Sequence, residues 1–232
     1  MSLKQDFRWY AQRLRIMGPA EIGYRLGERW TLALMRLQSG LQTRLRRDGP
    51  ELPGESQFCR ATTPQLPALC WDEASSAEIA ENLLAGSWPA LGFQWRWDSG
   101  PDIWRRAPDT GQLWPAQFFG SIPYRAGNPH GDVRVAWEPA RLQQLVSLAL
   151  LARKGPPDAA AGTRSRDAVL LLEDQLLSWV AANPPLIGIH YLSAMECALR
   201  LIAVCHALDL ARAHLTRPEA VWAALLSLVA SH

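Results

Sequence analysis

Apolar residues recur with the period of an α-helix through the last hundred residues, and proline-containing segments interrupt the pattern. Steps of three and four residues predict helices with one apolar side, and proline breaks a helix interior. We therefore expect four consecutive helices: one that enters through Pro139 and ends at 155–157, one that ends at 183–185, one over about 192–210, and one that starts at Thr216. Short connections between such helices predict antiparallel hairpins.

Two of these helices carry a start signal. Thr216 is followed by Glu219 three residues later, and Ser193 is followed by Glu196. A hydroxyl residue three positions before a glutamate is the sequence pattern of a capping box. We expect both pairs to cap their helices.

Residues 48–132 have a different composition, rich in proline, glycine and tryptophan. The alternation of Phe93-Gln94-Trp95-Arg96-Trp97 favours a strand, and the segment 76–84 favours one short helix. We expect a loop-rich, tryptophan-rich arm with minor β-structure, laid across the helices. Its tryptophans either stack on sugar rings or pin the arm in place, and the second role is the more common one.

Residues 1–47 predict an N-terminal pair of amphipathic helices. The first carries Phe7, Tyr10 and Leu14 and ends at Gly18-Pro19. The second has Pro19 in its first turn, and Glu21 and Arg25 form an i,i+4 pair on its other face. Its apolar side carries a row of residues at three- and four-residue steps: Ile22, Leu26, Trp30, Ala33 and Leu37.

Charge is unevenly distributed along the chain. Residues 1–47 hold ten Lys/Arg against three Asp/Glu, a balance of +7, and the remainder holds 14 against 19, a balance of −5. A polyanion or an anionic membrane surface can use the basic segment, and the alternative, which is the more common case, is a solvated helix face. The net charge of +2 does not indicate a nucleic-acid partner.

The chain carries no strong signal for a metal, a disulfide or a membrane span. Cys59, Cys70, Cys197 and Cys205 lack metal-ligand spacing, and the last two suit buried thiols in a helix. No apolar run approaches the roughly 18 residues of a transmembrane helix. The first residues lack a signal-peptide core, which predicts a cytoplasmic protein, or a periplasmic one if a leader precedes them. We expect no cofactor.

Two segments resemble the heparinase II/III-like polysaccharide lyases. Residues 131–145, GDVRVAWEPARLQQL, are similar to the segment GD(V/I)(K/R)xxWExxRxxxL that opens their helical domain. Residues 183–200, NPPLIGIHYLSAMECALR, are similar to the segment NPxxxGxxWxSxMExAxR. Residues 104–115, 122–124 and 19–26 also match what these proteins carry upstream. The sequence departs from the family at His190-Tyr191, where a tryptophan is usual.

The resemblance implies a mainly α fold, an incomplete α/α toroid of helical hairpins followed by a β-sandwich. Its members cleave uronic-acid-containing polysaccharides, glycosaminoglycans among them, by β-elimination. Their Asn or His, Tyr and His catalysts lie further along the toroid and in the sandwich. We therefore expect residues 133–232 to be a partial toroid cut before the catalytic segment, with no catalytic residue in this chain. The implied partners are an acidic polysaccharide and the missing C-terminal part of the enzyme.

Seven residues in the two segments are candidates for contact with saccharide. In the first, Trp137 can stack on a sugar and Arg141, paired with Glu138, can face a carboxylate. The alternative is an aromatic anchor at a helix N-terminus, with Glu138 favouring the helix dipole. In the second segment, a loop His and Tyr are plausible substrate contacts, and Arg200 is either an i,i+4 partner of Glu196 or a cleft cation. The full set is Trp137, Glu138, Arg141, His190, Tyr191, Glu196 and Arg200.

Two functions from different classes remain open. The first is the N-terminal portion of a heparinase II/III-like lyase, inactive alone. The second is a non-catalytic, acidic-polysaccharide-binding helical module linked to exopolysaccharide metabolism. A third hypothesis, an interaction protein that uses its basic N-terminal face on membranes, rests on the charge distribution alone.

Overall fold

The computed structural model describes residues 16–45, 73–97, 100, 102–154 and 159–232. The chain divides into two compact units, residues 1–47 and 48–232. Several sequence predictions lie outside the described residues: the helix with Phe7, Tyr10 and Leu14, the tryptophan at 71, the cysteines at 59 and 70, and the helix stop at 155–157.

The first unit contains helix α2 (Pro19–Leu45). Pro19 stands at its start, where the missing N–H is no loss because the first turn has no intrahelical acceptor. The predicted pair forms, since Arg25 donates to Glu21 at 2.9 Å. The larger apolar side chains of the helix, Leu26, Trp30 and Leu37 among them, are exposed.

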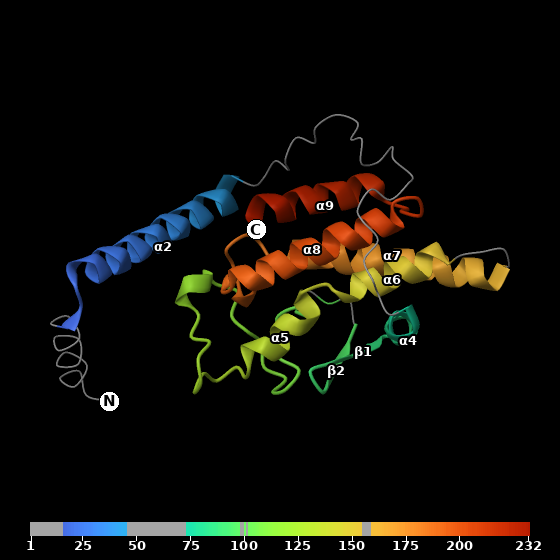
Figure 1. The fold of residues 1–232 in the computed structure, drawn as a ribbon, viewed down its shortest axis with the longest axis horizontal. Helices are drawn as coiled ribbons and strands as arrows, with labels where there is room; N and C mark the ends of the chain where they lie inside the picture. Colours follow the sequence, from blue (N-terminus) through green and yellow to red (C-terminus); the bar gives the residue numbers. More distant parts are fainter. Residues whose placement is uncertain (1–15, 46–72, 98–99, 101, 155–158) are drawn as a thin grey trace. The chain divides into compact units, whose positions relative to one another are not determined.

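The second unit is mainly helical, as expected. Its described part contains six α-helices, which form one layer of long helices with shorter elements against it (Figure 1). They are α4 (Glu73–Leu84), α5 (Val133–Ala140), α6 (Gln144–Arg153), α7 (Ala159–Ala182), α8 (Ala194–Ala211) and α9 (Pro218–Ser231). Successive helices α7, α8 and α9 run in alternating directions, as short connections predict (Figure 1). The toroid itself stays a prediction.

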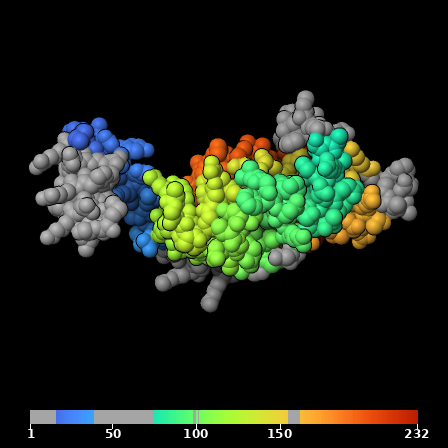
Figure 2. Space-filling model, turned by 90° about the horizontal axis from the view of Figure 1, so that it is seen from below, coloured from blue at the N-terminus to red at the C-terminus, as the bar shows by residue number. Residues whose placement is uncertain are grey.

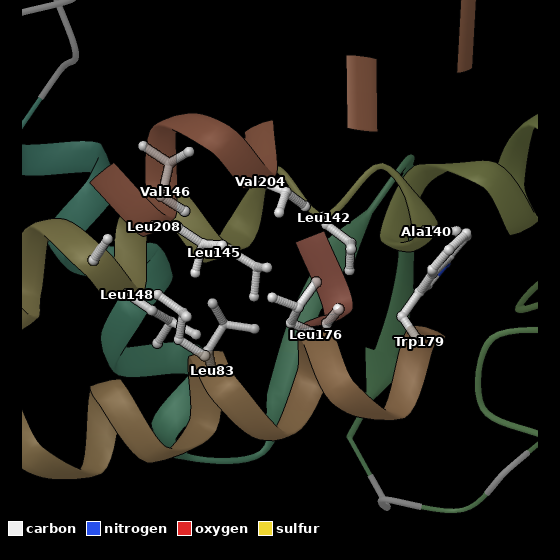
Figure 3. Close-up of a cluster of buried hydrophobic side chains, with 14 of the residues drawn as sticks. Leu83, Ala140, Leu142, Leu145, Val146, Leu148, Leu176, Trp179, Val204 and Leu208 are labelled. Atoms are coloured by element: carbon white, nitrogen blue, oxygen red, sulfur yellow. The ribbon is translucent and has the colours of Figure 1, made fainter. Parts of the chain in front are cut away.

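The core lies between α6 and its neighbours, because α6 packs against α4, α7 and α8 while α9 packs against α7 and α8. Figure 3 shows leucines from α4, α6, α7 and α8 meeting there, with Trp179 at one end. The predicted face of α7, including Val169, Leu172, Leu176 and Trp179, is buried. Burying each such side chain contributes roughly 1.5–3 kcal/mol before the entropy of ordering it is counted.

The arm contains the expected short helix and a small β-hairpin, strands β1 (Ser87–Ala90) and β2 (Phe93–Arg96). The turn residues Leu91 and Gly92 both have positive φ, as a two-residue hairpin turn of type I′ requires. Figure 2 shows this part of the chain, in green, spread over one face of the 48–232 unit. The 3-10 turn η1 (Phe119–Ser121) of this part contacts a second one, η2 (Ile189–Tyr191), which lies between α7 and α8.

Four tryptophans of the arm, Trp88, Trp95, Trp97 and Trp104, form a cluster. Trp88 and Trp95 pair across the hairpin with ring centroids 6.1 Å apart and planes nearly perpendicular. Trp104 lies 5.4 Å from Trp95 and donates its indole N–H to Ser178 on α7 at 3.0 Å. Trp104 is fully buried. These contacts favour the anchoring role of the arm tryptophans over sugar stacking.

The expected helix entering through Pro139 is wrong, because the chain forms two helices there. Helix α5 ends at Ala140 and α6 begins at Gln144, and between them Leu142 adopts φ 58°, which no helix continues through. Asp132 caps α5 by accepting from the Arg134 N–H at 2.9 Å. Trp137, Glu138 and Arg141 therefore lie at a helix C-terminus, not at an N-terminus as expected.

Neither predicted capping box forms. Ser193 precedes α8 without a side-chain cap bond, and α9 starts at Pro218 without one. Thr216 instead donates its hydroxyl and its N–H to Glu173 of α7, each at 2.6 Å. In each box one member is bound by a distant residue instead of its local partner, Thr216 by Glu173 and Glu196 by Arg141.

Candidate functional site

The seven candidate residues come from three elements that meet at one place. Trp137 and Glu138 lie in the last turn of α5 and Arg141 follows it, His190 and Tyr191 form η2, and Glu196 and Arg200 lie in the first turns of α8. We call these seven residues the motif cluster. Arg141 and Glu196, one from each resembling segment, are joined by a direct hydrogen bond across 55 positions of sequence, and Trp137 bonds to the backbone of Ile189 beside His190.

Trp137 ties α5 to η2. Its indole N–H donates to the Ile189 carbonyl at 2.9 Å, and its ring packs with Trp114 and Ile122 of the arm in a second apolar core. Only 9% of the residue is exposed. The flat face that a sugar would need is therefore largely covered by protein, which favours the anchoring alternative.

Arg141 is held between two carboxylates. Its Nε and one terminal nitrogen donate to the two oxygens of Glu196 at 2.7 and 2.9 Å. This is the bidentate geometry in which a guanidinium pairs with a carboxylate. The other terminal nitrogen pairs with Glu138. The hydrogen bonds that Arg141 donates to Glu196 raise the pKa of Arg141 above its usual value.

This ion triad contains the part of the motif cluster that solvent reaches best. The Glu138 and Arg141 side chains are 18% and 20% exposed, whereas that of Glu196 is 1% exposed. One positive charge against two carboxylates leaves the triad with a formal charge of −1. A uronate carboxylate would therefore have to displace Glu138 from Arg141, because the guanidinium has no unpaired side that it could bind.

Arg200 is fully buried behind the triad. Its Nε donates to the Ala140 carbonyl at 2.7 Å, its guanidinium carbon lies 4.2 Å from the centre of the Trp179 ring, and a terminal nitrogen contacts His232. Burial lowers the pKa of Arg200 to about 10, which leaves it charged at neutral pH. The Trp179 ring stabilises that charge. Arg200 thus neither pairs with Glu196 nor faces solvent.

His190 and Tyr191 lie between two helices, as expected, but both are buried. His190 donates from Nε2 to the Trp104 carbonyl at 2.8 Å, which fixes that tautomer, and Tyr191 donates its hydroxyl to the Asn183 carbonyl at 3.1 Å. Burial and the Arg200 charge lower the pKa of His190 to about 3. Their contact with saccharide stays a prediction, and the geometry gives both side chains protein partners instead.

Sequence reasoning missed a second buried ion site, between α7 and the residues that precede α9. Glu173 is fully buried and receives hydrogen bonds from Thr216 and Arg217. Burial alone would raise the pKa of Glu173, but these hydrogen bonds outweigh it and lower the pKa. A charged residue between the apolar positions Leu172 and Leu176 was the available signal, since a carboxylate on a covered face needs a partner.

The described residues contain no group of three or more His, Cys, Asp or Glu side chains placed to hold a metal ion. Cys197 and Cys205 are free thiols, and burial raises the pKa of both. The site thus consists of a salt-linked triad at the surface and a buried layer of Arg200, His190 and Tyr191 beneath it.

Comparison of the chain with protein-family models, curated proteins and solved structures finds no match. The resemblance described above therefore rests on the motif residues themselves.

Proposed function

We propose that this chain is the N-terminal, non-catalytic portion of a polysaccharide lyase of the heparinase II/III type. In this proposal the helices of residues 133–232 form part of an α/α toroid, and the ion triad faces an acidic polysaccharide. Cleavage by β-elimination requires a base, a carboxylate neutraliser and an acid, which the proposal assigns to residues outside this chain.

One observation carries the proposal. The two segments that resemble the lyase family are far apart in sequence, yet they bind one another. Two distinctive residues pair directly, Arg141 with Glu196, and two others donate to a backbone carbonyl of the opposite segment, Trp137 to Ile189 and Arg200 to Ala140. A chance likeness of two separate segments gives no reason for such contacts. A shared fold does, because residues that join two elements are constrained together.

The proposed contact with substrate is the outer edge of Arg141. A uronate carboxylate that displaces Glu138 would gain a charge-assisted hydrogen bond while Glu196 keeps the other side of the guanidinium. The displaced Glu138 can then accept a hydrogen bond from a sugar hydroxyl. This arrangement predicts selectivity for uronate over neutral saccharides.

The first test is for lyase activity of the chain alone. We expect no rise in ultraviolet absorbance from unsaturated uronate when it is incubated with heparan sulfate or alginate. A rise that grows with protein concentration would overturn the proposal, because the chain would then contain the catalysts.

The second test is calorimetric titration with uronate oligosaccharides and with a neutral oligosaccharide. Glu138→Gln removes the competing charge and should raise affinity for uronate several-fold, on the order of 1 kcal/mol. Glu78→Gln makes the same charge change at an exposed position of α4 and should have a much smaller effect. Unchanged or lower affinity in Glu138→Gln, or absence of uronate binding in both proteins, would contradict the proposed contact.

A stand-alone binding module for acidic polysaccharide is the second candidate. His190 and Tyr191 bind backbone carbonyls, so neither side chain is placed for proton transfer, and this agrees with both candidates because neither has a catalyst in this chain. A complete module should bind uronate oligosaccharides with a Kd of about 1 μM, and a partial toroid should bind far more weakly. The same titration therefore separates the two candidates.

A further inference from the structure

Helix α2 exposes a continuous apolar face that the proposed function does not use. Leu26, Trp30, Leu34 and Leu37 are each more than half exposed. With Ile22 and Ala33 they lie within one side of the helix, because successive members are three or four residues apart. The row from Ile22 to Leu37 extends over about 22 Å at 1.5 Å per residue. A face of this size calls for a covering partner.

The arginines of α2 follow this face along a single edge. Arg25, Arg29 and Arg36 each come three positions after a member of the apolar row, namely after Ile22, Leu26 and Ala33. A step of three residues turns about 60° back around the helix axis, so all three arginines lie on the same side of the row. Glu21 and Glu28 lie further round, on the polar side.

The sequence around the helix strengthens this positive charge. Residues 19–45 hold four arginines against two glutamates, and residues 1–47 as a whole have a balance of +7. Long cationic side chains beside an apolar face can extend their charged ends toward phosphates while their stems stay on the apolar surface. An apolar face with a basic edge and low average hydrophobicity is typical of helices that lie in a membrane interface.

We propose that α2 binds the surface of an anionic lipid bilayer, with its axis in the plane of the interface. Leu26, Trp30 and Leu37 enter the boundary between headgroups and acyl chains, and the arginine edge contacts lipid phosphates. The helix does not cross the bilayer: its charged side chains recur too often, and no helix in the described part of the chain is long and apolar enough to do so.

A second copy of the helix fits the face less well. A coiled-coil seam through Leu26, Trp30, Ala33 and Leu37 has the required four-three-four spacing, but it continues to Gly23 before this stretch and to Gly40 and Arg44 after it. Glycine and arginine supply no apolar knob, so the seam ends after about two heptads. A bilayer has no register requirement and uses the whole face, together with the arginine edge.

The test is flotation of the whole chain with vesicles of phosphatidylcholine, with and without phosphatidylserine. We expect binding to the anionic vesicles at low salt and weaker binding at about 0.5 M salt, where charges are screened beyond about 4 Å. Trp30→Glu should weaken binding about tenfold or more, since it removes a large apolar side chain from the interface. Thr31→Glu, the same charge change on the polar side, should weaken it only about twofold.

A further pair of variants tests the arginine edge. Arg29→Gln combined with Arg36→Gln should reduce binding to anionic vesicles, and Arg153→Gln combined with Arg166→Gln, the same charge change in the other unit, should not. Circular dichroism checks that each variant keeps its helix content. No binding by the parent chain, or equal losses in Trp30→Glu and Thr31→Glu, would overturn the proposal. The proposal would also be overturned if the parent chain self-associated instead of binding vesicles and Trp30→Glu abolished that self-association.

Discussion

Helices α2 and α7 are built from the same kind of sequence and differ in what covers them. Both are long, at 27 and 24 residues, and both repeat apolar residues at three- and four-residue steps. In α7, Leu172, Leu176 and Trp179 are at most 1% exposed, whereas Trp30 of α2 is 69% exposed. Apolar periodicity therefore predicts a helix and its apolar side, but not whether other parts of the protein cover that side.

The largest expected difference between the two units is in the loss of unfolding free energy when a tryptophan is replaced by alanine. Trp104→Ala removes a fully buried ring that packs on Trp95 and binds Ser178, and should lower the free energy of unfolding by about 3–5 kcal/mol. Trp30→Ala removes an exposed ring and should change it by less than about 0.5 kcal/mol. Urea denaturation followed by circular dichroism measures both. Similar losses would show that the face of α2 is covered within the folded chain.

The second comparison concerns ion pairs. Arg141→Ala leaves Glu196 buried without its cation and should cost about 3–5 kcal/mol of unfolding free energy. Arg25→Ala breaks an exposed pair with Glu21, in which both side chains are nearly half exposed, and should cost about 0.3–0.5 kcal/mol. The same denaturation experiment applies. A small loss in Arg141→Ala would mean that water reaches Glu196 and that the triad is more open than its burial indicates.

The third comparison uses pH, because residues 16–45 contain no histidine. Burial and the Arg200 charge lower the pKa of His190 to about 3 and that of His232 to about 4, so both are neutral in the folded unit. Below about pH 6.5 the unfolded chain binds protons that the folded chain does not. The stabilisation is therefore present above that pH and is lost progressively as the pH falls toward 3.

For His190 the loss amounts to about 2 kcal/mol of unfolding free energy at pH 5 relative to pH 8. Thermal melting across this range should show the 48–232 unit losing stability while the helix content of α2 is unaffected. His190→Gln should flatten the dependence, and His214→Gln, at an exposed position, should not. A dependence that His190→Gln leaves intact would assign it to other groups.

The smallest expected effects on stability come from substitutions at two helix starts within the 48–232 unit. Asp132 accepts the Arg134 N–H at the start of α5, so Asp132→Ala should cost about 1 kcal/mol. Ser193 makes no side-chain cap bond at α8, so Ser193→Ala should change stability by less than about 0.5 kcal/mol. Denaturation midpoints measure both. Equal losses would restore the capping role that the sequence pattern assigns to Ser193.

Much of the local structure was predictable from the sequence. The helix ends at 182 and 211 fall close to the expected ones, the hairpin forms where the alternating residues Phe93–Trp97 predicted a strand, and Glu21 pairs with Arg25. The break at Leu142 was not predictable in this way, because Pro139 suits a helix start as well as the last turn of a short helix. The N-cap at Asp132 was the signal that decides between the two.

The sequence predicted which residues make up the candidate site, but not what each of them does. All seven residues lie in one cluster, but Trp137, His190, Tyr191, Glu196 and Arg200 are buried and bind protein groups. A residue can be distinctive in a motif because it holds two elements together or because it contacts substrate. The sequence alone does not distinguish these two roles. Burial separates them, and it leaves the edge of Arg141 and Glu138 as the testable surface.

Most of the helices and one strand of the hairpin were predictable from the sequence, because they depend on side chains within a few positions of one another, whereas the break at Leu142 was not. Tertiary structure alone decided that Arg141 pairs with Glu196, that Thr216 binds Glu173 rather than capping its own helix, and that Arg200 lies under Trp179. Each of these contacts joins elements distant in sequence, and its strength depends on the burial that packing creates. Helices α7 and α2 differ in the same way. Their sequences predict the same kind of amphipathic helix, but packing buries the apolar side of α7 and leaves that of α2 exposed.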